Sequence, residues 1–162
     1  MEKRLYRGKS IETGEWVYGQ RLSVKEPLGK EFIITDDNII KESEISYGLN
    51  IDAFVAVDPE TVSEYTTVNA KNGDKIFEGD VVECCSYNEY FYNSTGPMEV
   101  FRRKMTVVWH NGNWKLKESY GGILSPNYWD IIYDGDVEVI GNIYDNPELA
   151  VSASFLSQYT QK

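Results

Sequence analysis

The dipeptide Asn111-Gly112 lies between two runs that favour β-strands, Thr106–His110 and Asn113–Leu116. Asn and Gly adopt positive φ more readily than other residues, and the type I′ turn of a two-residue hairpin requires positive φ at both central positions. The sequence therefore predicts an antiparallel β-hairpin, and a hairpin of this kind commits the surrounding chain to a β-sheet.

The two-residue turn also decides which side chains face each other across the hairpin. In this register His110 lies opposite Asn113, and Trp109 lies opposite Trp114. A directly opposed aromatic pair adds packing on one face of a sheet. Packing is the favoured role for the two tryptophans, and an aromatic partner-binding platform is the alternative.

A second stretch, Asn69–Cys85, reads as turn, short strand, turn and longer strand. Asn72-Gly73 supplies the first turn. Lys75–Phe77 is extended, and the β-branched pair Val81-Val82 begins the longer strand. This stretch joins an N-terminal β module to a C-terminal one.

Strand signals continue along the rest of the chain. We expect strands at residues 3–8, 16–22, 32–34, 54–57 and 137–144, with the first two joined as a hairpin. Residues 39–52 fit a strand or an extended loop, and residues 127–133 fit a short strand or one helical turn. In the last strand, alternation predicts one shared face for Val137, Val139, Gly141 and Ile143.

The predicted fold class is therefore all-β with little helix. The chain has 162 residues, of which 14% are aromatic, and such a composition suits pleated surfaces. We expect an N-terminal β-hairpin or sheet module at residues 1–68, a C-terminal SH3-like or barrel-like module at 69–149, and a tail at 150–162.

Several classes of protein are disfavoured by composition. No apolar run of about 18 residues exists, and the charged N-terminus lacks the apolar segment of a secretory signal, so a cytoplasmic protein without a membrane span is expected. The adjacent pair Cys84-Cys85 is poorly placed for a mutual disulfide because neighbouring strand residues point to opposite faces. With His110 as the single histidine, neither a zinc site nor a cofactor is expected.

The formal charge of −10 is unevenly distributed. Residues 1–30 hold seven Lys/Arg and four acids, so the acidic excess lies in the remainder. This distribution disfavours nucleic-acid binding, which needs clustered cations. It allows basic N-terminal strands to dock on an acidic partner, including a second copy of the chain.

The segment 86–97 combines aromatic and turn residues and reads as a long loop or flap. Its rings either pack on the sheet or form an exposed partner-binding surface. The candidate partner-binding residues of the chain are Tyr87, Tyr90, Phe91, Tyr92, Trp109 and Trp114. The basic triplet Arg102-Arg103-Lys104 is read as a solvated stretch, and single-strand nucleic-acid binding by this triplet and the neighbouring tyrosines is the alternative.

No arrangement of residues indicates catalysis. Phe77–Val81 and Tyr133–Val137 share the order aromatic, acid, Gly, Asp, Val, and both are explained better as turns that begin a strand than as a carboxylate pair. No Gly-rich phosphate loop is present. A non-enzyme is therefore expected, and in a hydrolytic enzyme, the least favoured alternative, Asp80, Asp136 and His110 would be the residues to mutate first.

Three blocks, 57–66, 71–82 and 137–149, together with Arg7-Gly8 and Trp16–Gly19, resemble the YopX family of phage and prophage proteins. The resemblance covers residues 1–149. It departs from the family pattern after Thr66, where a glycine is replaced, and residues 86–98 have no counterpart in that pattern. The resemblance implies a mostly β fold, a phage or prophage origin in a bacterium and self-association, and it carries no catalytic residues.

These observations favour a self-associating or host-protein-binding module over an enzyme. A homo-oligomer would dock its basic N-terminal strands on acidic neighbours. A host-binding protein would use its acidic body or its aromatic surfaces. Nucleic-acid association through residues 87–104 is the remaining alternative.

Overall fold

The computed structural model describes residues 4–25, 29–35, 53–87, 100–118, 128–131 and 137–150. The chain divides into two compact units, Met1–Tyr65 (unit 1) and Thr66–Lys162 (unit 2). The division falls within strand β5 (Ser63–Asn69), whereas the sequence predicts a boundary after residue 68. In the described ranges the helices are two single 3-10 turns, η3 (Pro59–Thr61) and η5 (Pro147–Ala150), so the predicted all-β class is confirmed.

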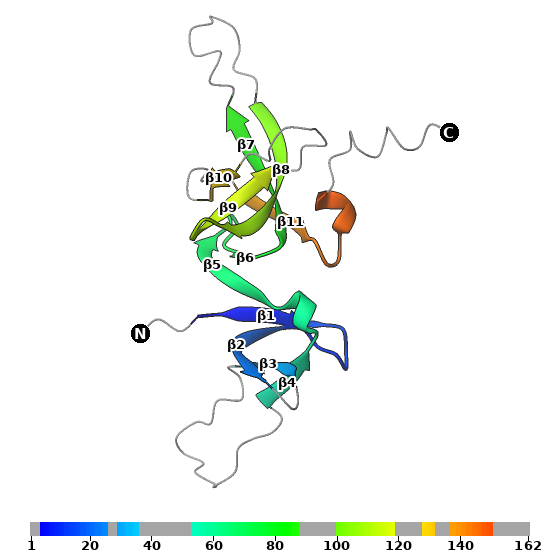
Figure 1. Ribbon diagram of the computed structural model, residues 1–162. Coiled ribbons are helices and arrows are strands. Elements are labelled where there is room, and N and C mark those ends of the chain that lie inside the picture. Colours follow the sequence, from blue (N-terminus) through cyan, green and yellow to red (C-terminus); the bar gives the residue numbers. More distant parts are fainter. Residues whose placement is uncertain are drawn as a thin grey trace, which may run out of the picture. The chain divides into compact units, whose positions relative to one another are not determined.

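Unit 1 is an antiparallel sheet. It contains β1 (Tyr6–Lys9), β2 (Trp16–Val24), β3 (Lys30–Thr35) and β4 (Phe54–Val57), in the order β4-β3-β2-β1, with the start of β5 beside β1 (Figure 1). The predicted hairpin of the first two strands is confirmed. Ser10 forms a bridge with Val57, and the Asp58 amide donates to the Lys9 carbonyl, so the sheet curls until its first and fourth strands meet.

The core of unit 1 lies on one face of these strands. Ile33 and Val57 are completely buried there. Two glycines face them and allow close packing: a Cβ on Gly8 would lie 3.0 Å from Val57, and a Cβ on Gly19 would lie 1.9 Å from the Ile34 carbonyl oxygen. Glycine is therefore required at position 19 by the approach of the neighbouring strand.

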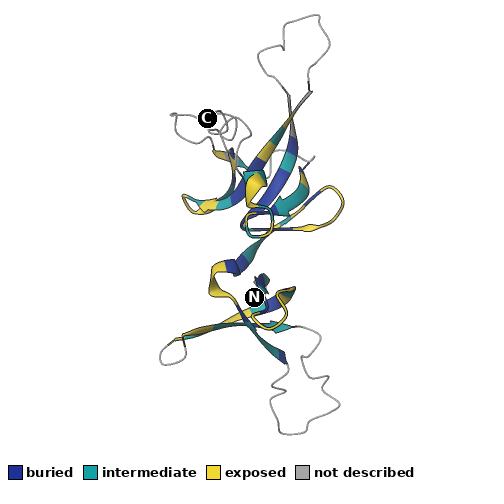
Figure 2. Ribbon diagram, turned by 90° about the vertical axis from the view of Figure 1, so that its right-hand side faces the viewer, coloured by how far each residue is buried: buried dark blue, intermediate teal, exposed yellow. Residues whose placement is uncertain are grey.

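Unit 2 is built on a five-stranded antiparallel sheet with the order β10-β9-β8-β7-β11. Its strands are β7 (Asp80–Tyr87), β8 (Val100–His110), β9 (Asn113–Glu118), β10 (Tyr128–Asp130) and β11 (Val137–Asn142), preceded by β6 (Lys75–Phe77) beside β5. The buried residues of unit 2, dark blue in Figure 2, include one hydrophobic cluster to which Val82, Val107 and Leu116 belong. The described part of the chain holds no helix long and apolar enough to cross a membrane.

The hairpin predicted at Asn111-Gly112 is confirmed residue by residue. Asn111 has φ 50° and Gly112 has φ 81°, as a type I′ turn requires. His110 pairs with Asn113, and Trp109 pairs with Trp114. Local turn chemistry was sufficient to define this register.

The last strand differs from its prediction. β11 ends at Asn142, and its pairing with β7 shifts between Val139 and Gly141. This bulge reverses the alternation beyond it, so Asn142 is buried and Ile143 is 36% exposed. The expected single face of Val137, Val139, Gly141 and Ile143 is therefore wrong beyond Val139.

The remaining segments complete the comparison with the sequence. The segment 127–133, predicted as a strand or a helical turn, contains strand β10. The segment before β5 forms the single turn η3, whose N-cap is the Asp58 side chain accepting from the Glu60 amide at 3.0 Å. Residues 39–52, most of the 86–97 flap and the tail beyond residue 150 lie outside the described residues.

Candidate interaction surfaces

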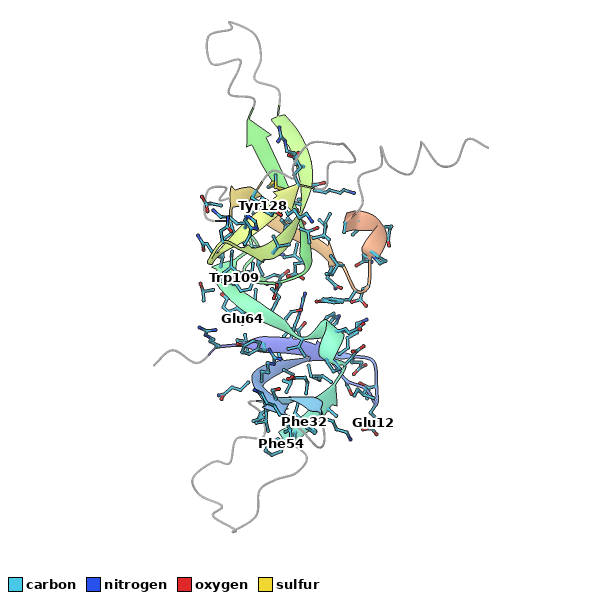
Figure 3. The ribbon with its side chains drawn as sticks, in the orientation of Figure 1. Glu12, Phe32, Phe54, Glu64, Trp109 and Tyr128 are labelled. Carbon is cyan, nitrogen blue, oxygen red and sulfur yellow. The ribbon has the colours of Figure 1, made fainter. Side chains whose placement is uncertain are left out.

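The predicted tryptophan pair lies at the tip of the β8–β9 hairpin. The ring centroids of Trp109 and Trp114 are 4.8 Å apart, and the ring planes meet at 71°. Trp114 packs against the core of unit 2. Trp109, which is labelled in Figure 3, is 54% exposed. The pair therefore combines an anchored ring with an exposed one.

The opposite face of the same hairpin is held by β10. His110 stacks on Tyr128, with centroids 3.8 Å apart and planes within 2° of parallel. Lys115 forms an ion pair with Asp130, its direct cross-strand neighbour. His110 is thus engaged in a stacking contact, and the hairpin that presents Trp109 is supported from its other side.

The predicted aromatic flap is only partly described. Tyr87 is the last residue of β7, and Tyr90, Phe91 and Tyr92 lie outside the described residues. Of the six candidate partner-binding residues, the structure therefore brings together Trp109 and Trp114.

The basic triplet contributes ion pairs within the β8 sheet. Arg102 Nη1 lies 2.7 Å from Glu83 Oε2, and Arg103 Nη1 lies 3.3 Å from Glu118 Oε1. Lys104 is directly opposite Glu83 across the strands. These acids compete with phosphate for the same cations, which weakens the nucleic-acid alternative.

The residues considered for catalysis have structural roles where they are described. Asp80 is buried, and its Oδ2 accepts a hydrogen bond from the Phe77 amide at 2.8 Å, which closes the turn before β7. Cys84 is buried in the core of unit 2, where its Sγ donates to the Arg103 carbonyl oxygen at 3.7 Å. Asp136 lies outside the described residues. Within the described ranges no group of three or more His, Cys, Asp or Glu side chains could hold a metal ion.

A hollow of about 290 Å³ lies on unit 2. Cross-strand neighbours Glu83 and Glu138 line it together with Lys71, Asn72, Cys84, Arg102 and Val137. Two cations and two carboxylates line it, so the hollow favours neither an anionic nor a cationic ligand.

A second surface, on unit 1, was missed by sequence reasoning. Strand pairing places Leu22 opposite Phe32 and Gln20 opposite Ile34, and continues to Ala56 and Phe54 on β4. Tyr18 and Trp16 extend the same face along β2. We call this the aromatic face; its apolar members are Trp16, Tyr18, Leu22, Val24, Phe32, Ile34, Phe54 and Ala56 (Figure 3 labels Phe32 and Phe54).

The aromatic face stays in contact with solvent. Tyr18 is 49% exposed and Leu22 is 37% exposed, and the other apolar members are half-buried. The sequence carried one signal for it, the shared side of Trp16, Tyr18 and Gln20. Only the register with β3 and β4 shows that the other apolar side chains join them.

The cations in strands β1 to β4 are divided between the two faces of the sheet. Arg21 pairs with Glu31 on the face opposite to the aromatic one. On the aromatic face the charged residues of β1 to β4 are Arg7, Lys9 and Lys30. Arg7 and Lys9 lie over the Trp16 ring at 4.5 and 5.5 Å from its centroid.

Two antiparallel β units with exposed aromatic surfaces define an all-β protein, and comparison with known proteins supplies its family. The YopX family model, described as YopX protein, matches residues 5–150, so the chain belongs to the YopX family, as its sequence predicts. The chain is similar to the crystal structure of protein EF1440 from Enterococcus faecalis, with 25% identity and a TM-score of 0.50 over 91% of this chain and 97% of that one. No curated protein matches the chain.

Proposed function

We propose that this YopX-family chain is a non-catalytic protein of phage or prophage origin that associates with further copies of itself in the bacterial cytoplasm. The contact is made by the aromatic face of unit 1. The observation that carries the proposal is the contrast between the two faces of one sheet. Ile33 and Val57 are fully buried on one face, and the apolar residues of the aromatic face all retain exposure. Contiguous exposed apolar patches are typical of partner sites.

Charge favours a second copy as the occupant of this face. Its charged residues in β1 to β4 are cations, whereas each unit of the chain holds eight Lys/Arg and thirteen Asp/Glu. Another copy therefore offers a predominantly acidic surface. Complementary potentials of this kind steer association and set its orientation.

The same charges argue against two aromatic faces meeting each other. Such a contact would bring Lys9 and Lys30 of both copies together, and like charges at an interface are costly. The proposed contact joins the aromatic face of one copy to an acidic surface of the next.

A binding role is also consistent with the contacts of the residues that would be candidates for catalysis, because these contacts stabilise the fold. Asp80 closes a turn and His110 stacks on Tyr128. An enzyme would need such groups to converge on a substrate site.

Sedimentation velocity at low and high salt tests the proposal. Screening between charges becomes severe between about 50 mM and 500 mM salt, so the wild-type chain should form assemblies at the lower concentration and dissociate at the higher. Leu22→Gln and Lys30→Glu should each shift the chain towards the monomer. Trp109→Ala, which removes an exposed aromatic ring from unit 2, is the matched control and should leave the assemblies intact.

Two results would contradict the proposal. One is a wild-type chain that sediments as a monomer at both salt concentrations. The other is an assembly that survives both unit 1 variants while their circular dichroism spectra stay native. Lys30→Glu alters an exposed charge and leaves the core intact, so its result does not depend on a core substitution being tolerated.

A further inference from the structure

The turn between β1 and β2 carries the most exposed large apolar side chain of the described residues. Residues 11–15 are all exposed, and Ile11 keeps 65% of its surface in contact with solvent. Glu12 and Glu15 belong to the same turn, and we call residues 11–15 the acidic turn (Figure 3 labels Glu12). An apolar side chain beside two carboxylates is complementary to an apolar surface that carries cations.

We propose that the acidic turn of one copy docks on the aromatic face of the next. Ile11 packs against Leu22 of the neighbouring copy, and the Glu12 carboxylate forms an ion pair with Lys30 there. This inference rests on the proposed function and names the acidic surface that completes the contact. Because the turn and the face are different surfaces of one unit, the contact is heterologous, and each copy can use both surfaces at once.

The charges at the two surfaces select this pairing. Lys30 is exposed on the aromatic face, and Glu12 is exposed in the turn. The ion pairs among the described residues involve neither of them, whereas Glu31, Glu64 and Glu83 each pair with an arginine of their own chain. A carboxylate that has no such pair can meet Lys30 without giving up an existing contact.

The exposed tryptophan of unit 2 does not match the aromatic face. Trp109 is 54% exposed, but the strands β8 and β9 that present it hold five Lys/Arg and one glutamate, Glu118, which is buried. Docking of this ring would bring cations towards Lys9 and Lys30, and like charges at an interface are costly. The local charges therefore favour Ile11 over Trp109 as the side chain that docks.

The spacing of the two contacts is similar on both surfaces. On the aromatic face Leu22 lies opposite Phe32, so Lys30, two residues earlier in β3, is its diagonal neighbour at about 7–8 Å. In the acidic turn Ile11 and Glu12 are consecutive, with Cα atoms about 3.8 Å apart. The long side chains of Glu12 and Lys30 span the difference, so the apolar contact and the ion pair can form together.

Backbone hydrogen bonds hold the acidic turn in place. The Ile11 amide donates to the Ala56 carbonyl at 3.0 Å, and the Ser10 amide donates to the Glu15 carbonyl at 2.9 Å. A preorganised turn loses little conformational entropy on docking. Since these bonds involve the backbone, substitutions of the exposed side chains at positions 11 and 12 leave them intact.

Sedimentation velocity at about 50 mM salt, where charge pairs are little screened, tests the inference on variants of the acidic turn. Ile11→Gln removes the apolar side chain and should weaken association about tenfold. Glu12→Lys reverses the charge that meets Lys30 and should weaken association about fivefold or more. Glu148→Lys makes the same charge change at an exposed glutamate of unit 2, so it is the matched control and should associate as the wild type does.

A mixture of two variants tests the pairing directly. Glu12→Lys keeps an intact aromatic face, and Lys30→Glu keeps an intact acidic turn. The two chains should therefore form a complex at a concentration at which neither associates alone. The chain that carries both substitutions should also regain association, because the ion pair is restored with its charges exchanged.

The outcomes separate this inference from the proposed function. If Lys30→Glu dissociates but Ile11→Gln and Glu12→Lys associate as the wild type does, the inference is wrong and another acidic surface docks on the aromatic face. A mixture of Glu12→Lys and Lys30→Glu that forms no complex also overturns the inference. A wild-type chain that stays monomeric contradicts the proposed function and this inference together.

Discussion

The backbone amide of Phe77 donates a 2.8 Å hydrogen bond to Oδ2 of Asp80. Asp80 is 1% exposed, so this carboxylate is withdrawn from water and used to close the turn that begins β7. An aspartate that reads in the sequence as a turn former therefore has that role in the fold.

Asp80→Ala should destabilise unit 2. The substitution removes the acceptor and leaves the Phe77 amide without this partner in a buried site, and hydrogen bonds to charged groups contribute about 1.5–3 kcal/mol. Urea unfolding of the wild-type chain, of Asp80→Ala and of the control variant Asp74→Ala measures the loss of stability. Asp74→Ala is the control, because Asp74 is exposed and bonds to Asn72 at the surface, and it should cost less than about 1 kcal/mol. Equal losses for the two variants would contradict the assigned role of Asp80.

Gly112→Ala should weaken the β8–β9 hairpin. Gly112 has φ +81°, and a residue with a Cβ in this left-handed region costs about 1–2 kcal/mol. Thermal unfolding and amide exchange of Trp109 and Trp114 report the change. Asn111→Gly is the matched substitution in the same turn: because Asn111 also has positive φ, glycine there should change stability by a few tenths of a kcal/mol at most.

Gly19→Ala should disrupt unit 1. A Cβ at position 19 would lie 1.9 Å from the Ile34 carbonyl oxygen, which is backbone and cannot rotate away. The strands β2 and β3 must separate to admit it, and overpacking of this kind costs about 3 kcal/mol or more. Proteolysis should then cut unit 1 faster in the variant. Gly14→Ala meets no atom within 4 Å and should be milder, since only its φ of +72° opposes the substitution. Native resistance of Gly19→Ala to protease would show that the strands do not approach this closely.

The Arg21–Glu31 pair should make unit 1 sensitive to acid. Hydrogen bonds of 2.9 and 3.0 Å from the Arg21 guanidinium hold the pKa of Glu31 below its ordinary value. A carboxylate with a lowered folded-state pKa contributes stability above its unfolded pKa of about 4.3, and that contribution is lost as the pH falls through the folded value. Glu31→Gln should remove this part of the pH dependence. A carboxyl resonance of Glu31 that titrates at or above the unfolded value would contradict the assignment.

Some of this fold could be predicted because its causes are local. The β8–β9 hairpin depends on two residues that tolerate positive φ, and β4 at Phe54–Val57 depends on a short apolar run that ends at Asp58-Pro59. In both cases the residues that decide the structure are adjacent in the chain. Boundaries were less accurate: β2 continues to Val24 and β7 to Tyr87, since strand ends depend on the neighbouring strand.

The candidate surfaces also combine features that the sequence could predict with features that depend on the tertiary structure. The opposed pair of Trp109 and Trp114 follows from turn length alone, whereas the exposure of one ring and the anchoring of the other depend on where the core lies. The bulge between Val139 and Gly141 could not be predicted from alternation. A Cβ on Gly141 would lie 2.5 Å from Asn146 Oδ1 and 2.8 Å from Leu149 Cδ1. This close packing explains why the residue at the end of the bulge is glycine.

The amino-acid sequence by itself determined the all-β class, the hairpin register and the turn role of Asp80, because each depends on backbone preferences within a few residues. Only the tertiary structure decided that Tyr18, Leu22, Phe32 and Phe54 form one exposed face and that the cations beside it are Arg7, Lys9 and Lys30. The physical reason is that a one-residue change in strand register moves every side chain to the other face of a sheet. Register between β2, β3 and β4 is set by contacts between residues far apart in the chain.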